Sequence, residues 1–427
     1  MMKSKFYAVC LLAFAWQATG CSSDAGNAQS AAGDSAATVA AADTAAATAV
    51  APATGATRAP AIIRGIYLNA YAAGSRNRLS KLLAIADSTE INTFVIDVKD
   101  EKGMRYRTTM PLQQQIGGEV TMPNLKAVVD SVEAHGVWTV ARIVVFKDPM
   151  LSQARPDWSI KDPGGALWRD KAGNTWVSAW DTNVWEYNIQ IAEEVLRAGF
   201  DEIQFDYVRF PEPFPSLPKQ IHPNERGDRT DAILAFIHKA EPRIKALGGV
   251  LAADLFGLSP NDPKDVQIGQ QWERIIAHVD HVLPMTYPSH YLPTHLKGIP
   301  KPNEMPYETV FASVGMGVIR ADRLRQAGKP AARIIPWLQA FSAPWVTRNY
   351  PYGEEQADAQ IRAVHDVGLE DWIFWHPGSK YEHIMAAFQR ETTPRAKKFE
   401  PPANLVAQVD LLEKMGARAE RDKVTSQ

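Results

Sequence analysis

Cysteine is nearly absent from this chain of 427 residues, which contains only Cys10 and Cys21, both close to the N-terminus. The rest of the sequence therefore offers no disulfide, no thiol nucleophile and no thiolate ligand for a metal. Its stability must come from a hydrophobic core, and 45% hydrophobic residues over this length are sufficient for one large domain.

Clustered histidines and an excess of one charge are also missing. The ten histidines form no H-x-H or H-E-x-x-H pattern, and His278 and His281 span the junction of a predicted helix and strand, where surface or packing roles are usual. We therefore expect no metal and no other cofactor. Lys and Arg number 46 and Asp and Glu 48, so the charge gives no indication of a nucleic-acid partner.

The N-terminus has the features of a bacterial lipoprotein signal. Lys3 and Lys5 precede an apolar run from Phe6 to Trp16, which is too short to span a bilayer but fits a secretory signal. The following Ala18-Thr19-Gly20-Cys21 resembles a lipobox, although Ala18 stands where leucine is usual. We expect residues 1–20 to be removed and the lipidated Cys21 to anchor the protein in the cell envelope, on the periplasmic or extracellular face. An ordinary secretory signal is the alternative.

Residues 21–60 are expected to form a flexible linker. Residues 22–60 contain 17 alanines, no aromatic residue and one basic residue, Arg58. Gly, Ser, Thr and Pro interrupt every alanine run, and nothing in the segment can bury a core. Such a segment would hold a folded domain away from the membrane.

From Ala61 onwards, short apolar runs alternate with helical patterns. The predicted strands are Ile63–Asn69, Thr93–Lys99, Trp138–Phe146, Glu202–Val208, Val250–Phe256, Val282–Tyr287, Ile334–Ala340 and Trp372–Trp375. The helices that follow them are predicted at Arg78–Ser88, Asn124–Ala134, Asn183–Ala198, Asp228–Leu247, Gly269–Val279, Tyr307–Ala327, Glu354–Val367 and Tyr381–Gln389.

This alternation predicts an α/β fold, a (β/α)8 TIM barrel over residues 61–391. Strands that are almost continuously apolar indicate burial on both faces, hence a parallel sheet, and eight strand-helix units fit a closed barrel. An open doubly wound sheet is the alternative, but the chain has no G-x-G-x-x-G motif. Residues 392–427 form a charged C-terminal tail, in which Leu405, Val409 and Leu412 would fit either one short helix or a loosely docked segment.

Polar residues near the C-terminal ends of the predicted strands are candidates for the site, because these ends carry the active sites of TIM barrels. Alternate residues of a barrel strand point inward, so Asp97 and Lys99 are expected to share a face, as are Gln204 and Asp206. Candidate substrate-binding residues at these ends are Asp97, Lys99, Arg142, Gln204, Arg209, Tyr287, Gln339 and Trp375.

Asp206 and Asp254 are the candidate catalytic residues. They lie at similar depth on neighbouring strands, which are about 4.8 Å apart, so the two carboxyl groups can flank a glycosidic oxygen. One would protonate the leaving group while the other attacks the sugar or activates water. Alternatively, either aspartate is a structural carboxylate paired with Arg142, Lys99 or Arg209.

The 12 tryptophans give an indication of the ligand. The segment after the third strand contains Trp158, Trp168, Trp176, Trp180 and Trp185, and other strand ends carry Tyr207, Tyr287, Trp337 and Trp375. Aromatic faces stack on the apolar faces of sugar rings. The alternative is that the tryptophans of the long loop anchor it to the barrel.

Four segments carry a resemblance to a known family. They are R-G-I-Y-L at 64–68, F-V-I-D-V-K-D at 94–100, A-R-I-V-V-F at 141–146 and, most specifically, F-D-Y-V-R-F-P at 205–211. Together they resemble a bacterial family of predicted glycoside hydrolases, first catalogued as a domain of unknown function, over about residues 62–390. The resemblance implies a TIM barrel with Asp206 as its central carboxylate, and it implies no particular sugar.

A more distant similarity is to alpha-amylase-type barrels, in which the fourth strand also ends in a nucleophilic aspartate. Gln204 stands where those enzymes usually carry arginine, Asp254 where they carry glutamate and Gln339 where they carry aspartate. Because a third carboxylate is missing, this similarity implies only the nucleophile role of Asp206.

Three functions fit these observations. The first is hydrolysis of a glycosidic bond in an envelope or extracellular polysaccharide. The second is carbohydrate binding without catalysis by an envelope lipoprotein, which would keep the aromatic loop but not need both aspartates. The third is a different barrel hydrolase, such as a metal-dependent deacetylase, which would require a His/Asp ligand cluster that the sequence does not suggest.

Overall fold

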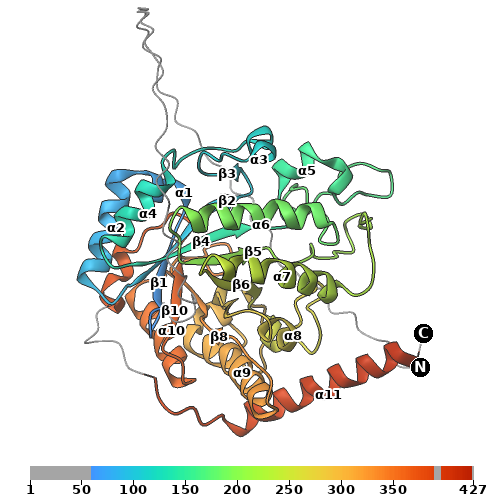
Figure 1. Ribbon diagram of the computed structural model, residues 1–427. Helices are drawn as coiled ribbons and strands as arrows, with labels where there is room; N and C mark the ends of the chain where they lie inside the picture. Colours follow the sequence, from blue (N-terminus) through green and yellow to red (C-terminus); the bar gives the residue numbers. More distant parts are fainter. Residues whose placement is uncertain (1–58, 389–395, 426–427) are drawn as a thin grey trace, which may run out of the picture.

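The computed structural model describes residues 59–388 and 396–425, and its centre is a barrel of parallel strands (Figure 1). In order around the ring, the strands are β1 (Arg64–Leu68), β2 (Thr93–Asp100), β4 (Trp138–Val144), β5 (Glu202–Asp206), β6 (Val250–Phe256), β7 (His281–Met285), β9 (Trp337–Gln339) and β10 (Trp372–Trp375).

The two ends of the sheet meet at β1. This strand pairs in parallel with β2 on one side, with Gly65 opposite Thr93, and with β10 on the other, with Arg64 opposite Trp372. Closure rules out the open doubly wound sheet and confirms the predicted (β/α)8 barrel.

The seventh barrel strand is interrupted. Its first part, β8 (Arg333–Ile334), pairs with β7, and Pro336 separates it from β9. Proline has no N–H to donate to a neighbouring strand, which explains a break at this position. Hydrogen bonding continues around it, because Ile335 N donates to Val282 O and Ile373 N donates to Pro336 O.

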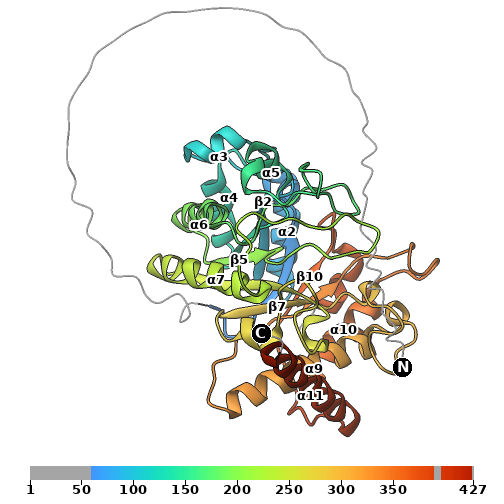
Figure 2. The ribbon, with the colours of Figure 1, turned by 90° about the vertical axis from the view of Figure 1, so that its right-hand side faces the viewer.

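Helices surround the barrel (Figures 1 and 2). Those that follow barrel strands are α2 (Arg76–Ser88), α4 (Leu125–Glu133), α6 (Thr182–Arg197), α7 (Arg229–Ala246), α8 (Trp272–Ile276), α9 (Pro306–Gln326), α10 (Glu354–Asp366) and the 3-10 helix η6 (Glu382–Phe388). Several begin at a side chain that caps backbone N–H groups, such as Asn124 before α4, Asp181 before α6 and Asp228 before α7.

The helix after β6 is shorter than the sequence predicts. Instead of Gly269–Val279, only Trp272–Ile276 is helical. The preceding loop is fixed by Asp265, whose carboxylate accepts hydrogen bonds from the N–H groups of Gln267 and Gly269. Gln267 and Gly269 have positive φ angles of 61° and 83°, which a helix does not allow.

The remaining short elements lie in the strand-to-helix connections. They are α1 (Ala70–Gly74), β3 (Gly103–Met104), α3 (Pro111–Ile116), α5 (Pro149–Ala154) and the 3-10 turns η2 (Pro156–Trp158), η3 (Ser259–Asn261), η4 (Pro288–His290) and η5 (Pro302–Glu304). The longest connection joins β4 to α6. The loops are therefore longest at the carboxyl ends of the strands, where a barrel enzyme carries its site.

The inside of the barrel is packed with side chains. Val95, Val140, Val250, Ala252 and Leu283 fill it, and each is at most 2% exposed. Towards the amino ends of the strands, Glu202 accepts a hydrogen bond from the Trp138 indole (2.9 Å) and lies 3.0 Å from His281 Nδ1. This filled interior leaves the carboxyl ends as the place for a cleft.

The C-terminal segment is one helix of 23 residues, α11 (Ala403–Thr425), and is longer than the short helix considered from the sequence. It lies beside α9 in Figures 1 and 2, where Leu405 and Val409 pack on Met316 and Ile319 of α9. Arg323 of α9 adds ion pairs of 2.6 Å with Asp410 and with Glu413.

We expect Leu405→Ala to lower the free energy of unfolding by about 2 kcal/mol, because it empties a buried leucine site. Leu405 is 3% exposed, whereas Leu411 on the same helix is 58% exposed. Leu411→Ala is the matched control and should change stability by less than about 0.5 kcal/mol. Urea denaturation of both variants measures this, and equal losses would show that α11 is not anchored through Leu405.

The predicted signal peptide, Cys21 and most of the linker fall outside the described residues. Within the described ranges, no helix combines the length and apolar character needed to cross a membrane.

Candidate active site

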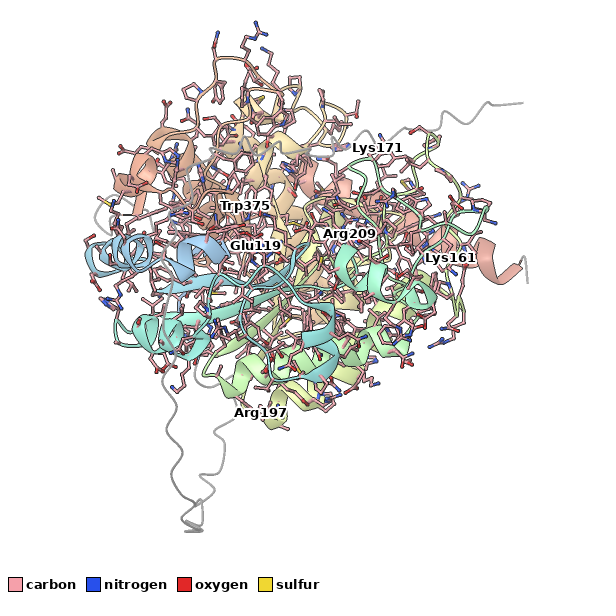
Figure 3. All side chains as sticks on the ribbon, turned by 90° about the horizontal axis from the view of Figure 1, so that it is seen from above. Glu119, Lys161, Lys171, Arg197, Arg209 and Trp375 are labelled. Carbon is pink, nitrogen blue, oxygen red and sulfur yellow. The ribbon has the colours of Figure 1, made fainter. Side chains whose placement is uncertain are left out.

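A cleft of about 1120 Å³ opens at the carboxyl ends of the barrel strands. Each of the eight strands contributes at least one side chain to its lining, among them Tyr67, Asp97, Arg142, Asp206, Asp254, Met285, Trp337 and Trp375. Arg209 and Trp375 from this region lie near the middle of Figure 3, whereas Arg197, at the end of α6, lies at the periphery.

Arg142 connects two carboxylates on the floor of the cleft. Its Nη1 lies 2.5 Å from Asp97 Oδ1, and its Nε donates to Asp206 Oδ2 at 2.9 Å. The register of β2, β4 and β5 explains this arrangement, because Asp97 pairs with Arg142 and Val144 pairs with Asp206 across adjacent strands. The guanidinium thus neutralises charge that two neighbouring carboxylates would otherwise concentrate.

Asp97 has a second partner, which the sequence reading did not identify. The hydroxyl of Tyr67 donates to Asp97 Oδ2, and the Tyr67 ring lies 5.8 Å from the Arg142 guanidinium carbon. Burial raises the pKa of Asp97 above its usual range, and the contacts with Arg142 and Tyr67 oppose this shift. The inward alternation of β1 was the signal that could have identified Tyr67.

Asp254 lies on β6, the strand that neighbours the β5 strand of Asp206. Both hydrogen bonds to it reach Oδ1, from Gln204 Nε2 and from Trp337 Nε1, each at 2.8 Å. Burial raises the pKa of Asp254 well above its usual range, and the neighbouring charge of Asp206 raises it further. Both influences favour the protonated form of this carboxyl.

Asp206 and Asp254 are neighbours in the barrel. Phe205 of β5 pairs with Ala253 of β6, so the next residue of each strand is one of the two aspartates. Tyr207, directly after Asp206, has a positive φ of 49°, and its N–H donates to Asp206 Oδ1 at 2.5 Å. A tyrosine in this strained conformation ends the strand and fixes the carboxylate, a feature typical of functional sites.

Lys99 does not reach the cleft, and the expectation that it shares a face with Asp97 is wrong. The pairing of β2 with β4 shifts register between these two residues, and such a bulge breaks the alternation of side chains. Lys99 is instead fully buried on the helix side, 2.8 Å from Asp148 and 5.5 Å from the ring centre of Tyr187 on α6.

Two glutamines from the predicted set lie behind the cleft surface. Gln204 is buried and positions Asp254 through its amide. Gln339 is also buried: it accepts from Ser289 N at 3.0 Å and donates to Phe341 O at 2.9 Å, so it holds two loops in place. Neither is among the residues that line the cleft.

The other predicted residues, Arg209, Tyr287 and Trp375, line the cleft. Arg209 is 3.2 Å from Glu212 and donates to the carbonyl of Phe210. Tyr287 and Trp375 belong to a group of aromatic side chains in the cleft, called the aromatic wall below, and their ring centres are 5.7 Å apart.

The aromatic wall extends from the floor to the rim of the cleft. Tyr67 lies 5.7 Å from Trp375, Trp375 lies 5.3 Å from Phe341, and Phe341 lies 6.2 Å from Trp345 between ring centres. Phe341 and Trp345 were not predicted, because they lie on an irregular loop where no periodicity marks the inward positions. Aromatic rings next to charged groups suit the mixed apolar and hydroxylated surface of a sugar.

The tryptophans of the long loop after β4 mostly anchor it. Trp158, Trp168, Trp176, Trp180 and Trp185 are all buried, and of these five only Trp176 lines the cleft. The indole N–H groups of Trp168, Trp180 and Trp185 donate to the backbone carbonyls of Pro218, Arg226 and Ala179. The alternative that these tryptophans anchor the loop therefore fits most of them, and the aromatic wall holds most of the rings that face the cleft.

The histidine pair considered for a metal is separated in the structure. His281 faces Glu202 inside the barrel, whereas His278 contacts His238 at 3.1 Å on the surface. Across residues 59–388 and 396–425, no group of three or more His, Cys, Asp or Glu side chains is arranged to hold a metal ion.

Solved structures similar to this chain include several glycoside hydrolase domains. The PgaB (BpsB) domain from Bordetella bronchiseptica is 14% identical, with a TM-score of 0.55, over 77% of this chain and 99% of that domain. The PelA domain from Pseudomonas aeruginosa is 11% identical, with a TM-score of 0.42, over 76% of this chain and 98% of that domain. The likeness to the PgaB domain supports the barrel fold.

A hypothetical protein from Ruminiclostridium thermocellum ATCC 27405 is 33% identical over 44% of this chain and 97% of its own, with a TM-score of 0.41. Among curated proteins, no match was found. Residues 65–381 match the family described as "Putative glycosyl hydrolase domain", and because this match spans most of the chain, the protein belongs to that family.

Proposed function

We propose that this member of a glycoside hydrolase family cleaves glycosidic bonds of an envelope or extracellular polysaccharide, with Asp254 as the general acid and Asp206 as the nucleophile or base. One observation carries the proposal: two adjacent strand-end aspartates lie in opposite electrostatic settings. Asp206 is paired with the Arg142 guanidinium, whereas Asp254 is buried with a raised pKa.

Glycoside hydrolysis requires this division of roles. A protonated carboxyl must donate to the leaving oxygen while an ionised carboxylate attacks the sugar or activates water. Because Gln204 and Trp337 both donate to Asp254 Oδ1, the proton of the neutral carboxyl would be carried on Oδ2. The electrostatic preference for a proton on Asp254 thus supports its role as the acid.

The shape and lining of the cleft support a carbohydrate chain as substrate. A space of about 1120 Å³ is larger than a single sugar ring needs, and one wall is aromatic. The charged side chains of the cleft include the pairs Arg142 with Asp97 and Arg209 with Glu212, so they offer donors and acceptors for hydroxyl groups without a large net charge.

Carbohydrate binding without catalysis is the second candidate. The ion pairs of Arg142 with Asp97 and Asp206 are also what a structural network would show. In that case the cleft would bind glycans and release no product.

The experiment that separates the two uses a panel of nitrophenyl glycosides and soluble polysaccharides. We expect release of nitrophenol or of new reducing ends from at least one member, and loss of that release in the double variant Asp206→Asn/Asp254→Asn. Glycan binding by wild-type protein without product from any bound glycan would favour the binding role.

We propose further that Cys21 anchors the protein to the cell envelope, because it follows a lipobox-like Thr19-Gly20. Cys21→Ser should move the protein from the membrane fraction to the soluble periplasmic or secreted fraction, because the acyl chains provide the attachment. Cys10→Ser, within the expected signal, is the control and should leave fractionation unchanged. A Cys21→Ser protein that remains in membranes after salt and carbonate washing would contradict the anchor.

A further inference from the structure

Trp345 is a large aromatic residue displayed at the rim of the cleft. It lies in a turn after β9, where Val346 N donates to Ala343 O, and its side chain lines the cleft. The residue is 46% exposed, although tryptophan is normally among the most buried residues on average. So large an apolar surface exposed inside a cleft is available to a ligand.

The orientation of Trp345 is fixed by its neighbour. Its ring plane is 12° from parallel with that of Phe341, which in turn meets Trp375 edge-on near the floor. Phe341 is 4% exposed and therefore provides a rigid support. Trp345 is thus a preorganised flat surface. A series of ring contacts through Phe341 and Trp375 connects it to Tyr67, whose hydroxyl bonds to Asp97 on the floor of the cleft.

We propose that Trp345, supported by Phe341, is a distal subsite that stacks on a pyranose ring of a polysaccharide at a distance from the bond to be cleaved. The proposal rests on the proposed function and adds to it that the substrate is a chain of several sugar units. A flat, rigid aromatic surface binds the apolar face of a sugar ring with little loss of side-chain entropy.

Affinity should therefore depend on chain length. An oligosaccharide too short to extend from the floor to the rim cannot reach Trp345 while its reducing or non-reducing end occupies the carboxylate floor. Loss of the Trp345 ring should weaken binding of long oligosaccharides and leave binding of short ones unchanged.

The test measures dissociation constants of Trp345→Ala, Trp345→Phe and wild-type protein by calorimetry. The probes are dimers to hexamers of β-1,4-linked N-acetylglucosamine, β-1,4-linked glucose and α-1,4-linked glucose. All proteins carry Asp206→Asn, so that no probe is consumed. Val346→Ala is the matched control, because Val346 is 41% exposed and lies outside the cleft lining.

We expect Trp345→Ala to bind the hexamer of a recognised ladder about tenfold more weakly than the Trp345 protein and to bind its dimer equally well. Trp345→Phe should recover part of the loss, and Val346→Ala should match the parent. Equal hexamer affinity in Trp345→Ala would overturn the subsite while leaving the proposed hydrolysis intact. A parent protein that binds none of the hexamers would overturn the subsite as well, and turnover on the separate glycoside panel would show whether the hydrolytic function survives.

Discussion

Asp206→Asn should reduce turnover of a competent glycan by about a thousandfold or more, while glycan binding is largely kept. Removing a nucleophile or base raises the barrier by several kcal/mol, and each 1.36 kcal/mol is a factor of about ten in rate. The variant should fold, because the amide oxygen can still accept from Tyr207 N and Arg142 keeps its ion pair with Asp97. The guanidinium is therefore not left as a buried charge without a partner.

Thermal melting should be used to check that this variant is folded before its kinetics are compared with those of wild type. Asp87→Asn is the control, since Asp87 lies on α2, where it pairs with His135 on the surface. The control should turn over at the wild-type rate. An Asp206→Asn protein that keeps turnover within tenfold of wild type would remove Asp206 from the mechanism and favour the binding role.

Asp254→Asn should reduce turnover of glycans with poor leaving groups by a comparable factor. It should reduce turnover of nitrophenyl glycosides much less. An acid is needed only where the departing oxygen must be protonated, and a nitrophenolate departs without this help. The amide oxygen can still accept from Gln204 and Trp337, so the geometry around position 254 should persist. Equal losses with both classes of leaving group would assign Asp254 a role other than the acid.

The stability of Asp254→Asn provides an independent check. Because burial and Asp206 raise the pKa of Asp254 in the folded protein, the folded state holds a proton that the unfolded chain releases from about pH 4 upwards. The contribution of this carboxyl to wild-type stability therefore falls as pH rises through this window, until the folded-state carboxyl also ionises. The amide carries no such penalty, so the variant should gain stability relative to wild type between acidic and neutral pH.

The barrel and most of its floor were predictable from the sequence for a common reason. Strands buried on both faces are apolar, so a charged residue near the end of such a strand stands out, as Asp97, Arg142, Asp206 and Asp254 do. Strand alternation then indicates that they point inward, and all four line the cleft.

Lys99 shows where this reasoning fails. Alternation assumes a regular strand, and the register shift between Asp97 and Lys99 reverses the direction of the second side chain. A bulge depends on pairing with the neighbouring strand, so the sequence of β2 alone does not reveal it. The buried ion pair of Lys99 with Asp148 likewise joins residues from different segments.

The aromatic residues illustrate a second limit. Tryptophans in the loop after β4 have the composition of a sugar-binding surface, yet their indole N–H groups bond to backbone carbonyls and fix the loop. Trp345 was not predicted from the sequence, because an irregular loop has no period that indicates which side chains face a cleft. Composition suggested aromatic stacking, and tertiary packing determined which rings are available for it.

The pH dependence of kcat/KM tests the central claim most directly, namely that a protonated Asp254 acts beside Asp206 on a glycosidic bond. For a glycan with a poor leaving group, we predict that kcat/KM stays high at neutral pH and falls as rising pH removes the proton from Asp254. This alkaline limb should disappear in Asp254→Asn and persist in Asp100→Asn, the control for a second cleft carboxyl whose pKa burial and Asp97 raise to about 7. An alkaline limb that is unchanged in Asp254→Asn, or a wild-type rate that already falls near pH 4, where an ordinary aspartate ionises, would contradict the account.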